Sequence, residues 1–152
     1  CVCTPGQIQR YMNKISGPLL DRIDIQCEIT PVPFKDISKA AQGEPSAEIR
    51  KRVIRAREIQ AERFSGQKGI HCNAQMSERM IHQYAEPDEA GISMLRMAME
   101  RLSLSARAYN RILKVARTIA DLEGCEHVES HHLAEAIGYR TLDRGDWAER
   151  GI

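Results

Sequence analysis

The chain has 152 residues, of which 42% are hydrophobic, 28% charged and 5% aromatic, and its formal net charge is +1. These values are typical of a globular protein with an aliphatic, helix-rich core, and they exclude a protein that overall charge draws to nucleic acid or to a membrane. No apolar run approaches the length of a membrane-spanning helix, so any anion-binding site must be local.

The five cysteines are spread along the chain without the spacing of a disulfide framework, which favours a reducing, cytoplasmic setting. The sequence opens at Cys1 rather than at a methionine, and nothing there resembles a signal peptide. We therefore expect part of a longer protein that is neither secreted nor membrane-embedded. Cys1 and Cys3 could supply half of a four-ligand zinc site, but no second pair lies nearby, so free thiols are the favoured interpretation.

The first 34 residues predict two short helical segments followed by a strand. Residues 4–15 open with Thr4 and Pro5, a good cap and a good first helical residue, and residues 16–21 repeat the pattern. In residues 22–30 the apolar side chains of Ile23, Ile25, Cys27 and Ile29 alternate with polar ones, as in a strand with one buried face. A lone strand cannot satisfy its backbone, so we expect residues 1–34 to be the trailing edge of an α/β domain whose sheet lies elsewhere.

Residues 35–45 are predicted to be a linker, and residues 46–64 a basic helix with one apolar side. That side carries Ile49, Val53, Ala56 and Phe64. Six arginines and lysines outnumber three glutamates in this helix, at positions 50, 51, 52, 55, 57 and 63. A solvated basic face is favoured, and contact with DNA is the alternative.

The next segments predict a loop and two helices that contribute to the core. Residues 65–74 hold two glycines and read as a loop, while residues 77–84 predict a short helix. Residues 87–101 predict a longer helix with Ile92, Leu95 and Met99 spaced for burial. Its methionines are expected to fill the core rather than to form a binding surface.

Residues 105–124 form the longest segment whose apolar and basic residues separate onto opposite helical faces. Ser105 is a good cap, and Gly124 is a good residue just past the end. The apolar stripe contains Ala106, Tyr109, Ile112, Leu113, Ala116, Ile119 and Ala120. Arg107, Arg111 and Lys114 follow one another on another stripe, without an acidic residue within one turn. That stripe is free to meet an anion, although a solvated face is favoured by the pattern alone.

The remaining residues predict a final helix and a polar tail. Residues 125–132, which contain Cys125, His127, His131 and His132, form the second cluster that could hold a metal. No convergent set of three ligands is evident in it, so a metal site is not expected. Residues 130–142 predict a helix that buries Leu133, Ala134, Ile137 and Tyr139. Residues 46–143 are thus expected to form a bundle of about five helices, followed by a polar tail at residues 144–152.

Three segments taken together resemble a known family: residues 1–25 (CVCTPGQIQRYMNKISGPLLDRIDI), residues 43–64, and residues 104–124 (LSARAYNRILKVARTIADLEG) with the downstream HHLAEAIGYR. They are similar to the C-terminal part of the bacterial magnesium-chelatase-like AAA+ ATPases, the YifB/ComM family, over nearly the whole chain. The resemblance implies a mainly α fold, in which a helical lid domain follows the last strand and helices of an incomplete α/β ATPase core.

The resemblance also implies roles for individual residues. Arg22 matches the position of an arginine finger, which would act on the nucleotide of a neighbouring subunit. Arg107 matches the sensor-2 arginine of the lid, and Arg111 is a second candidate one turn away. Cys1 and Cys3 would be the second half of a four-cysteine insertion. The loop at residues 66–69 lacks the lysine and hydroxyl residue of a phosphate loop, so the chain alone is not expected to hydrolyse ATP.

For the intact protein the resemblance implies ATP and Mg²⁺ as cofactors, assembly into a ring, expected to be a hexamer, and work on DNA of the helicase or branch-migration type. Relatives of the competence type carry that role in natural transformation. One alternative is a chelatase-type ATPase that remodels a protein or a metal-insertion partner. Another is a helical DNA-binding module that uses the basic helix at residues 46–64.

Overall fold

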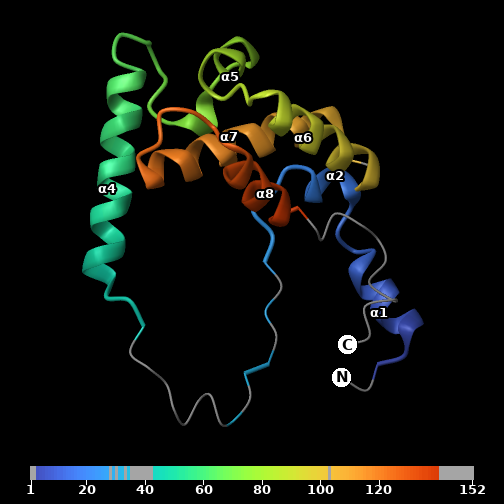
Figure 1. Ribbon diagram of the computed structural model, residues 1–152. Helices are drawn as coiled ribbons and strands as arrows, with labels where there is room; N and C mark the ends of the chain where they lie inside the picture. Colours follow the sequence, from blue (N-terminus) through green and yellow to red (C-terminus); the bar gives the residue numbers. More distant parts are fainter. Residues whose placement is uncertain are drawn as a thin grey trace.

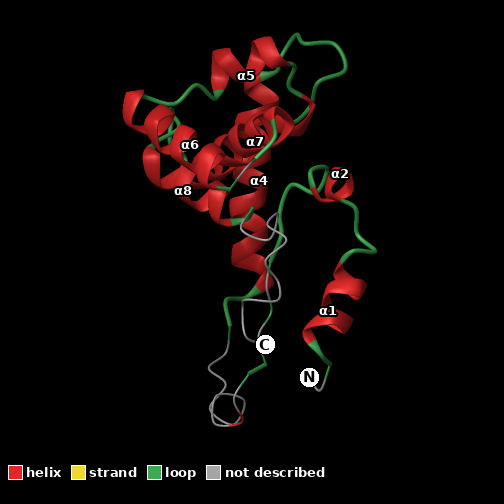
Figure 2. Cartoon of the chain, turned by 90° about the vertical axis from the view of Figure 1, so that its right-hand side faces the viewer, coloured by secondary structure: helices red, strands yellow, loops and turns green. Residues whose placement is uncertain are grey.

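The computed structural model describes residues 3–27, 29, 31–32, 34, 43–102 and 104–140, and in these residues the fold is mainly α, as expected. The α-helices are α1 (Pro5–Met12), α2 (Gly17–Leu20), α4 (Ser46–Arg63), α5 (Glu78–Tyr84), α6 (Glu89–Arg101), α7 (Ala106–Glu123) and α8 (Ser130–Gly138), with a 3₁₀ turn, η1, at Asn73–Gln75. Figure 2 shows these helices joined by loops. None of the helices in the described ranges is both long and apolar enough to cross a membrane.

Helix α7 is the centre of the bundle. It contacts α4, α5, α8 and η1, and α6 in turn contacts α8, so that these four helices are grouped around it (Figure 1). Its ends are those that the sequence predicts: the Ser105 hydroxyl accepts a hydrogen bond from the Ala108 amide at 3.2 Å, and Gly124 adopts φ 78° just beyond the last turn. A left-handed residue at this place favours glycine because it has no Cβ to clash.

The core lies between α7 and its neighbours. Its fully buried apolar side chains include Leu95, Ile112, Leu113, Ala116, Leu133 and Ala136. Two aromatic rings close one edge, where Phe64 and Tyr84 meet in a T-shaped arrangement with centroids 5.9 Å apart. The expected burial of Ala134 is wrong, because Ala134 is exposed and the neighbouring Leu133 and Ala136 face the core instead.

A buried ionic network joins α4 to α7. Asp121 is fully buried and pairs with Arg63 through both carboxylate oxygens, while Arg117, 1% exposed, pairs with the same carboxylate. Arg117 also donates to the carbonyls of Glu126 and Cys125, at 2.7 and 2.6 Å, and Asn73 donates to Asp121 at 2.7 Å. Arg63 therefore does not belong to a solvated basic face, because its partner is a carboxylate 58 positions away.

Helix α4 extends beyond the bundle at its N-terminal end (Figure 1). On the side that the sequence marks as apolar, Ala56 and Phe64 are buried, whereas Ile49 and Val53 stay exposed. The predicted apolar side is thus covered only over the half of the helix that lies against α7.

The segment predicted as a strand contains no strand among its described residues. Ile23 and Ile25 are exposed, by 40% and 52%, and Ile29 is 88% exposed. The alternation is real, but a ladder needs a neighbouring strand, and the described chain offers none. Instead the segment is fastened to the end of α8: the Gln26 amide donates to the Tyr139 carbonyl at 3.0 Å, and Arg140 donates to the Ile23 carbonyl.

Candidate functional site

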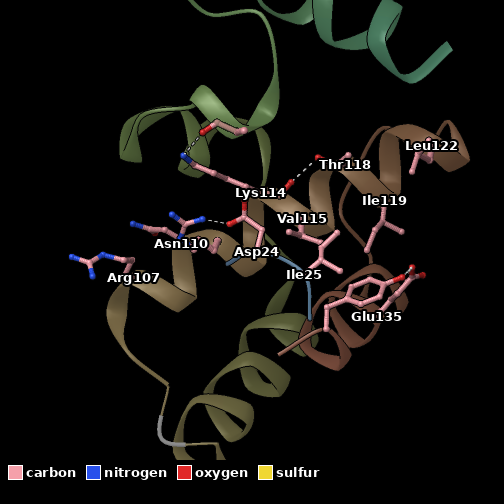
Figure 3. Close-up of a pocket in the computed structure, with 13 residues that line it drawn as sticks. Asp24, Ile25, Arg107, Asn110, Lys114, Val115, Thr118, Ile119, Leu122 and Glu135 are labelled. Atoms are coloured by element: carbon pink, nitrogen blue, oxygen red, sulfur yellow. Dashed lines mark hydrogen bonds and ion pairs between the residues drawn. The ribbon is translucent and has the colours of Figure 1, made fainter. Parts of the chain in front are cut away.

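A groove of about 510 Å³ runs along the outer side of α7, where the 24–25 segment and α8 meet it (Figure 3). One end is cationic and is lined by Arg107, Arg111 and Lys114. The rest is largely apolar and is lined mainly by Ile25, Val115, Ile119, Leu122 and Tyr139. The groove therefore combines a surface for a flat or aliphatic group with a place for an anion.

Helical spacing brings the three cations together. Positions 107, 111 and 114 are four and three residues apart, so their side chains leave the same face of α7. The first turn of α7 contains no acidic residue, and the positive end of the helix dipole adds to the charge of Arg107 there. The sequence predicts this stripe, and the structure confirms that its residues line one groove.

Arg107 is the cation best placed to meet a ligand. It is exposed, and within the described part of the chain it makes no hydrogen bond or ion pair. Figure 3 shows it at the open end of the groove, pointing away from the apolar residues. A guanidinium in this position keeps its donors available for an incoming anion.

Arg111 is engaged, which corrects the expectation that the whole stripe is free of acidic neighbours. Its guanidinium forms an ion pair with the Asp24 carboxylate, which comes from the segment beyond α2. The two residues are 87 positions apart, so a search within one helical turn could not find the pair.

Lys114 is held at the edge of the groove, where its ammonium donates to the Ala74 carbonyl at 2.9 Å. Partial burial lowers its pKa below the ordinary value of 10.5, and the nearby Arg111 lowers it further, whereas Asp24 acts in the opposite direction. A larger fraction of Lys114 is therefore in the neutral amine form than for a solvated lysine at the same pH.

Arg22 lies elsewhere. It is exposed and donates to the Pro18 carbonyl at 2.7 Å, one turn back along the chain, and it does not line the groove. The structure thus brings Arg107 and Arg111 together and leaves Arg22 apart from them. Of the two cysteines proposed as half of a zinc site, Cys1 falls outside the described residues and Cys3 is exposed.

A cluster that the sequence identifies only in part lies at the other end of α7. Potential ligand atoms of Glu123, Cys125 and His132 all lie within 4.8 Å of one another. The sequence points to Cys125 and His132 within residues 125–132, but not to Glu123 of the preceding helix. Only the packing of α7 against α8 brings Glu123 to them.

The hydrogen bonds of His132 favour a structural role for this cluster. The Nδ1 atom of His132 accepts a hydrogen bond at 2.9 Å from the backbone amide of Glu129, the N-cap residue of α8. The ring proton is therefore on Nε2, which donates to Glu123 at 3.1 Å. A histidine in this tautomer has no free lone pair for a metal. His131 shares the same acceptor, at 2.9 Å, and this bond raises the pKa of His131 and lowers that of Glu123.

Two family models match this chain, one over its first residues and one over most of the rest. The family described as "Magnesium chelatase, subunit ChlI C-terminal" matches residues 43–140, and "Magnesium chelatase, subunit ChlI" matches residues 1–37. The chain belongs to the magnesium chelatase ChlI family. Its division at residues 35–45 stays a prediction.

Individual relatives of this chain are found in several bacteria. "Competence protein ComM" of Haemophilus influenzae is 42% identical over 142 residues, and YifB of Salmonella typhimurium is 44% identical over 143 residues. A protein of Mycobacterium tuberculosis is 36% identical over 140 residues. The aligned region covers 92–93% of this chain but only 27% of each of these relatives. The expected resemblance to the YifB/ComM group is thereby confirmed.

Proposed function

We propose that this chain is the lid and the core edge of a magnesium-chelatase-like AAA+ ATPase, and that its groove receives the phosphates of ATP. The observation that carries the proposal is the exposed Arg107 at the positive end of α7, beside an apolar surface and without a partner among the described residues. Because the chain spans 27% of its relatives, the activity belongs to the intact protein. There Arg107 is the sensor-2 arginine, and Arg111 is the second candidate.

The residues of the groove fit a nucleotide better than they fit its metal. Guanidinium groups donate in a fork that matches phosphate oxygens, and the apolar side chains beyond them suit a base. The carboxylates that line the groove are Asp24 and Glu135, and both are engaged, with Arg111 and with the Tyr139 hydroxyl. Mg²⁺ would neutralise phosphate charge in the intact protein, and its protein ligands lie outside this groove.

Arg22 supports an oligomeric enzyme. Its guanidinium is at the surface, on a short turn, and away from the cationic groove of its own chain. We assign it as an arginine finger that reaches the nucleotide of an adjacent subunit and stabilises charge on the transferring phosphoryl group. A ring of subunits, with a hexamer as the expected size, brings each Arg22 to its neighbour.

The intact protein is proposed to act on DNA as an ATP-driven motor of the helicase or branch-migration type. Support comes from the relative named a competence protein, which covers nearly the whole chain. Stimulation of ATP hydrolysis by branched DNA is the expected result. Indifference to DNA favours the alternative, a chelatase-type ATPase that remodels a protein or metal-insertion partner, which the family description supports.

A DNA-binding role of α4 alone is a weaker alternative. Lys51 and Arg52 are paired with Glu48 and Glu44, at 2.8 and 2.6 Å, which reduces the charge that the helix can offer to phosphates. Salt-dependent DNA binding by this chain would support this alternative, and absence of binding at low salt would remove it.

The assigned arginines are tested by replacing each with alanine in the intact protein and measuring steady-state ATP hydrolysis. Loss of one donor to a developing charge typically lowers kcat by roughly a hundredfold or more. We expect this for Arg22→Ala and Arg107→Ala, with Arg96→Ala, an exposed residue of α6, as the matched control. Unchanged hydrolysis in both variants would overturn both roles.

A further inference from the structure

We propose that Asp24 is an internal competitor for the anion site of the groove: its carboxylate occupies Arg111 until a polyphosphate displaces it. The inference rests on the proposed function and deepens it, since it names the residue that sets the anion affinity of that groove. Asp24 belongs to the predicted core edge at residues 1–34 and Arg111 to the predicted lid, so the same ion pair also connects these two parts.

The position of Asp24 in the groove suits this role. Of the two carboxylates that line it, Glu135 accepts from the Tyr139 hydroxyl at 2.8 Å at the apolar end, whereas Asp24 contacts the cationic end. Figure 3 shows Asp24 between Lys114 and the apolar side chains. An anion that uses the same Arg111 Nη1 donor must therefore displace this carboxylate.

The backbone around Asp24 is fastened independently of the ion pair. On one side the Ile23 carbonyl accepts from Arg140, and on the other the Gln26 amide donates to the Tyr139 carbonyl at 3.0 Å. The Asp24 side chain can rotate away from Arg111 while these hydrogen bonds persist. Displacement therefore costs one ion pair rather than the attachment of the whole segment.

The balance of charges favours a polyphosphate over Asp24. The side chains of Asp24 and Arg111 are 49% and 28% exposed, and ion pairs with this access to solvent are weak. A polyphosphate carries several charges and can accept from Arg107, Arg111 and Lys114 at once, whereas the carboxylate bonds only Arg111 among the groove cations described. Once displaced, Asp24 still repels the bound anion and lowers its affinity.

The test is calorimetric titration of this chain with inorganic tripolyphosphate at low salt. Asp24→Asn should tighten binding roughly three- to tenfold, because it removes both the competitor and the repulsion. Glu44→Gln, which removes an exposed carboxylate paired with Arg52 outside the groove, should leave the affinity unchanged. The gain should also shrink when Asp24→Asn is combined with Arg111→Gln, since the competition acts through Arg111.

Equal or weaker binding by Asp24→Asn, or no binding by either protein, would overturn the inference. Circular dichroism shows whether each variant is folded. If Asp24→Asn does not fold, the same titration is made with Asp24→Ser. The proposed function is tested separately, by measuring ATP hydrolysis by the intact protein. Hydrolysis that depends on Arg107, combined with tripolyphosphate affinity that does not respond to Asp24, would refute this inference alone.

Discussion

At the residue scale, Asp121 carries the most sensitive polar contact of the bundle. Its carboxylate is completely buried between Arg63 and Arg117, so its removal leaves two guanidinium groups without their counter-ion. Breaking a buried ion pair from one side typically costs about 3–5 kcal/mol. We expect Asp121→Ala to lower the free energy of unfolding by that amount, as measured by urea denaturation.

The control for this prediction is Glu44→Ala, which removes an exposed partner of Arg52. Exposed pairs contribute at most about 1 kcal/mol, so the midpoint of unfolding should hardly move. Equal effects of the two substitutions would mean that the buried network does not hold α4 to α7.

A second prediction at this scale concerns the pH dependence of the His131–Glu123 pair. The pKa of His131 is raised above 6.5 by its hydrogen bond to Glu123, and the pKa of Glu123 is lowered below 4.5 by the same bond. The pair therefore contributes fully between pH 4.5 and 6.5. Its contribution is lost as the pH rises through the folded pKa of His131 or falls through that of Glu123.

The measurement is an NMR titration of the His131 ring. We expect a midpoint above 6.5 that moves back toward this value in Glu123→Ala. A His131 midpoint that is the same in both proteins would show that the hydrogen bond does not form in solution.

At the scale of elements, the close packing of α6 against α8 depends on Gly91. A Cβ built at this position would lie 2.6 Å from Leu133 Cδ1 and 2.8 Å from Pro87 Cβ. Alanine normally favours a helix by about 1 kcal/mol over glycine, but overpacking a core costs about 1–3 kcal/mol. We expect the clash to dominate, so that Gly91→Ala lowers the melting temperature.

Gly138, the last residue of α8, is the matched control. A Cβ there would meet no atom of the described residues within 4 Å, so Gly138→Ala should be neutral or slightly stabilising in the same thermal melt. Stabilisation by Gly91→Ala would instead mean that α6 and α8 have room to separate.

The helices themselves could be predicted from local sequence. Ser105 and Gly124 place the ends of α7 correctly, and α5 lies within the short helix expected at residues 77–84, because capping and periodicity are local properties. The strand at residues 22–30 could not be confirmed in the same way. Its alternation is local, but a strand forms only when another strand pairs with it, which the described chain does not provide.

At the scale of the whole molecule, the cations of the groove could be predicted from the sequence, but their acidic partner could not. Helical spacing places Arg107, Arg111 and Lys114 on one face, which the sequence shows directly. The Asp24–Arg111 pair joins residues 87 positions apart, and Arg63–Asp121 joins residues 58 apart. These contacts depend on how the helices pack, so no local sequence pattern predicts them.

The proposed division of roles between Arg22 and Arg107 can be tested by mixing subunits of the intact protein. If Arg22 acts on a neighbouring subunit and Arg107 on its own, an equal mixture of Arg22→Ala and Arg107→Ala subunits contains some nucleotide sites with both arginines. We expect the mixture to regain part of the ATP hydrolysis that each variant lacks. A mixture as inactive as its components would place both arginines in the same subunit's site.

The central claim is that the cationic end of the groove receives nucleotide phosphates. It is tested most directly with an ATP analogue whose terminal phosphate carries an acyl group, which transfers to a nearby lysine amine as an amide and releases ATP. Partial burial lowers the pKa of Lys114 and so raises the fraction of neutral amine, the form that this reaction needs. In the intact protein, we predict that mass spectrometry finds acylation at Lys114, suppressed by excess ATP and by Arg107→Ala, with exposed Lys68 unlabelled. Labelling of Lys68 without Lys114, or labelling of Lys114 that ATP does not suppress, would contradict the account.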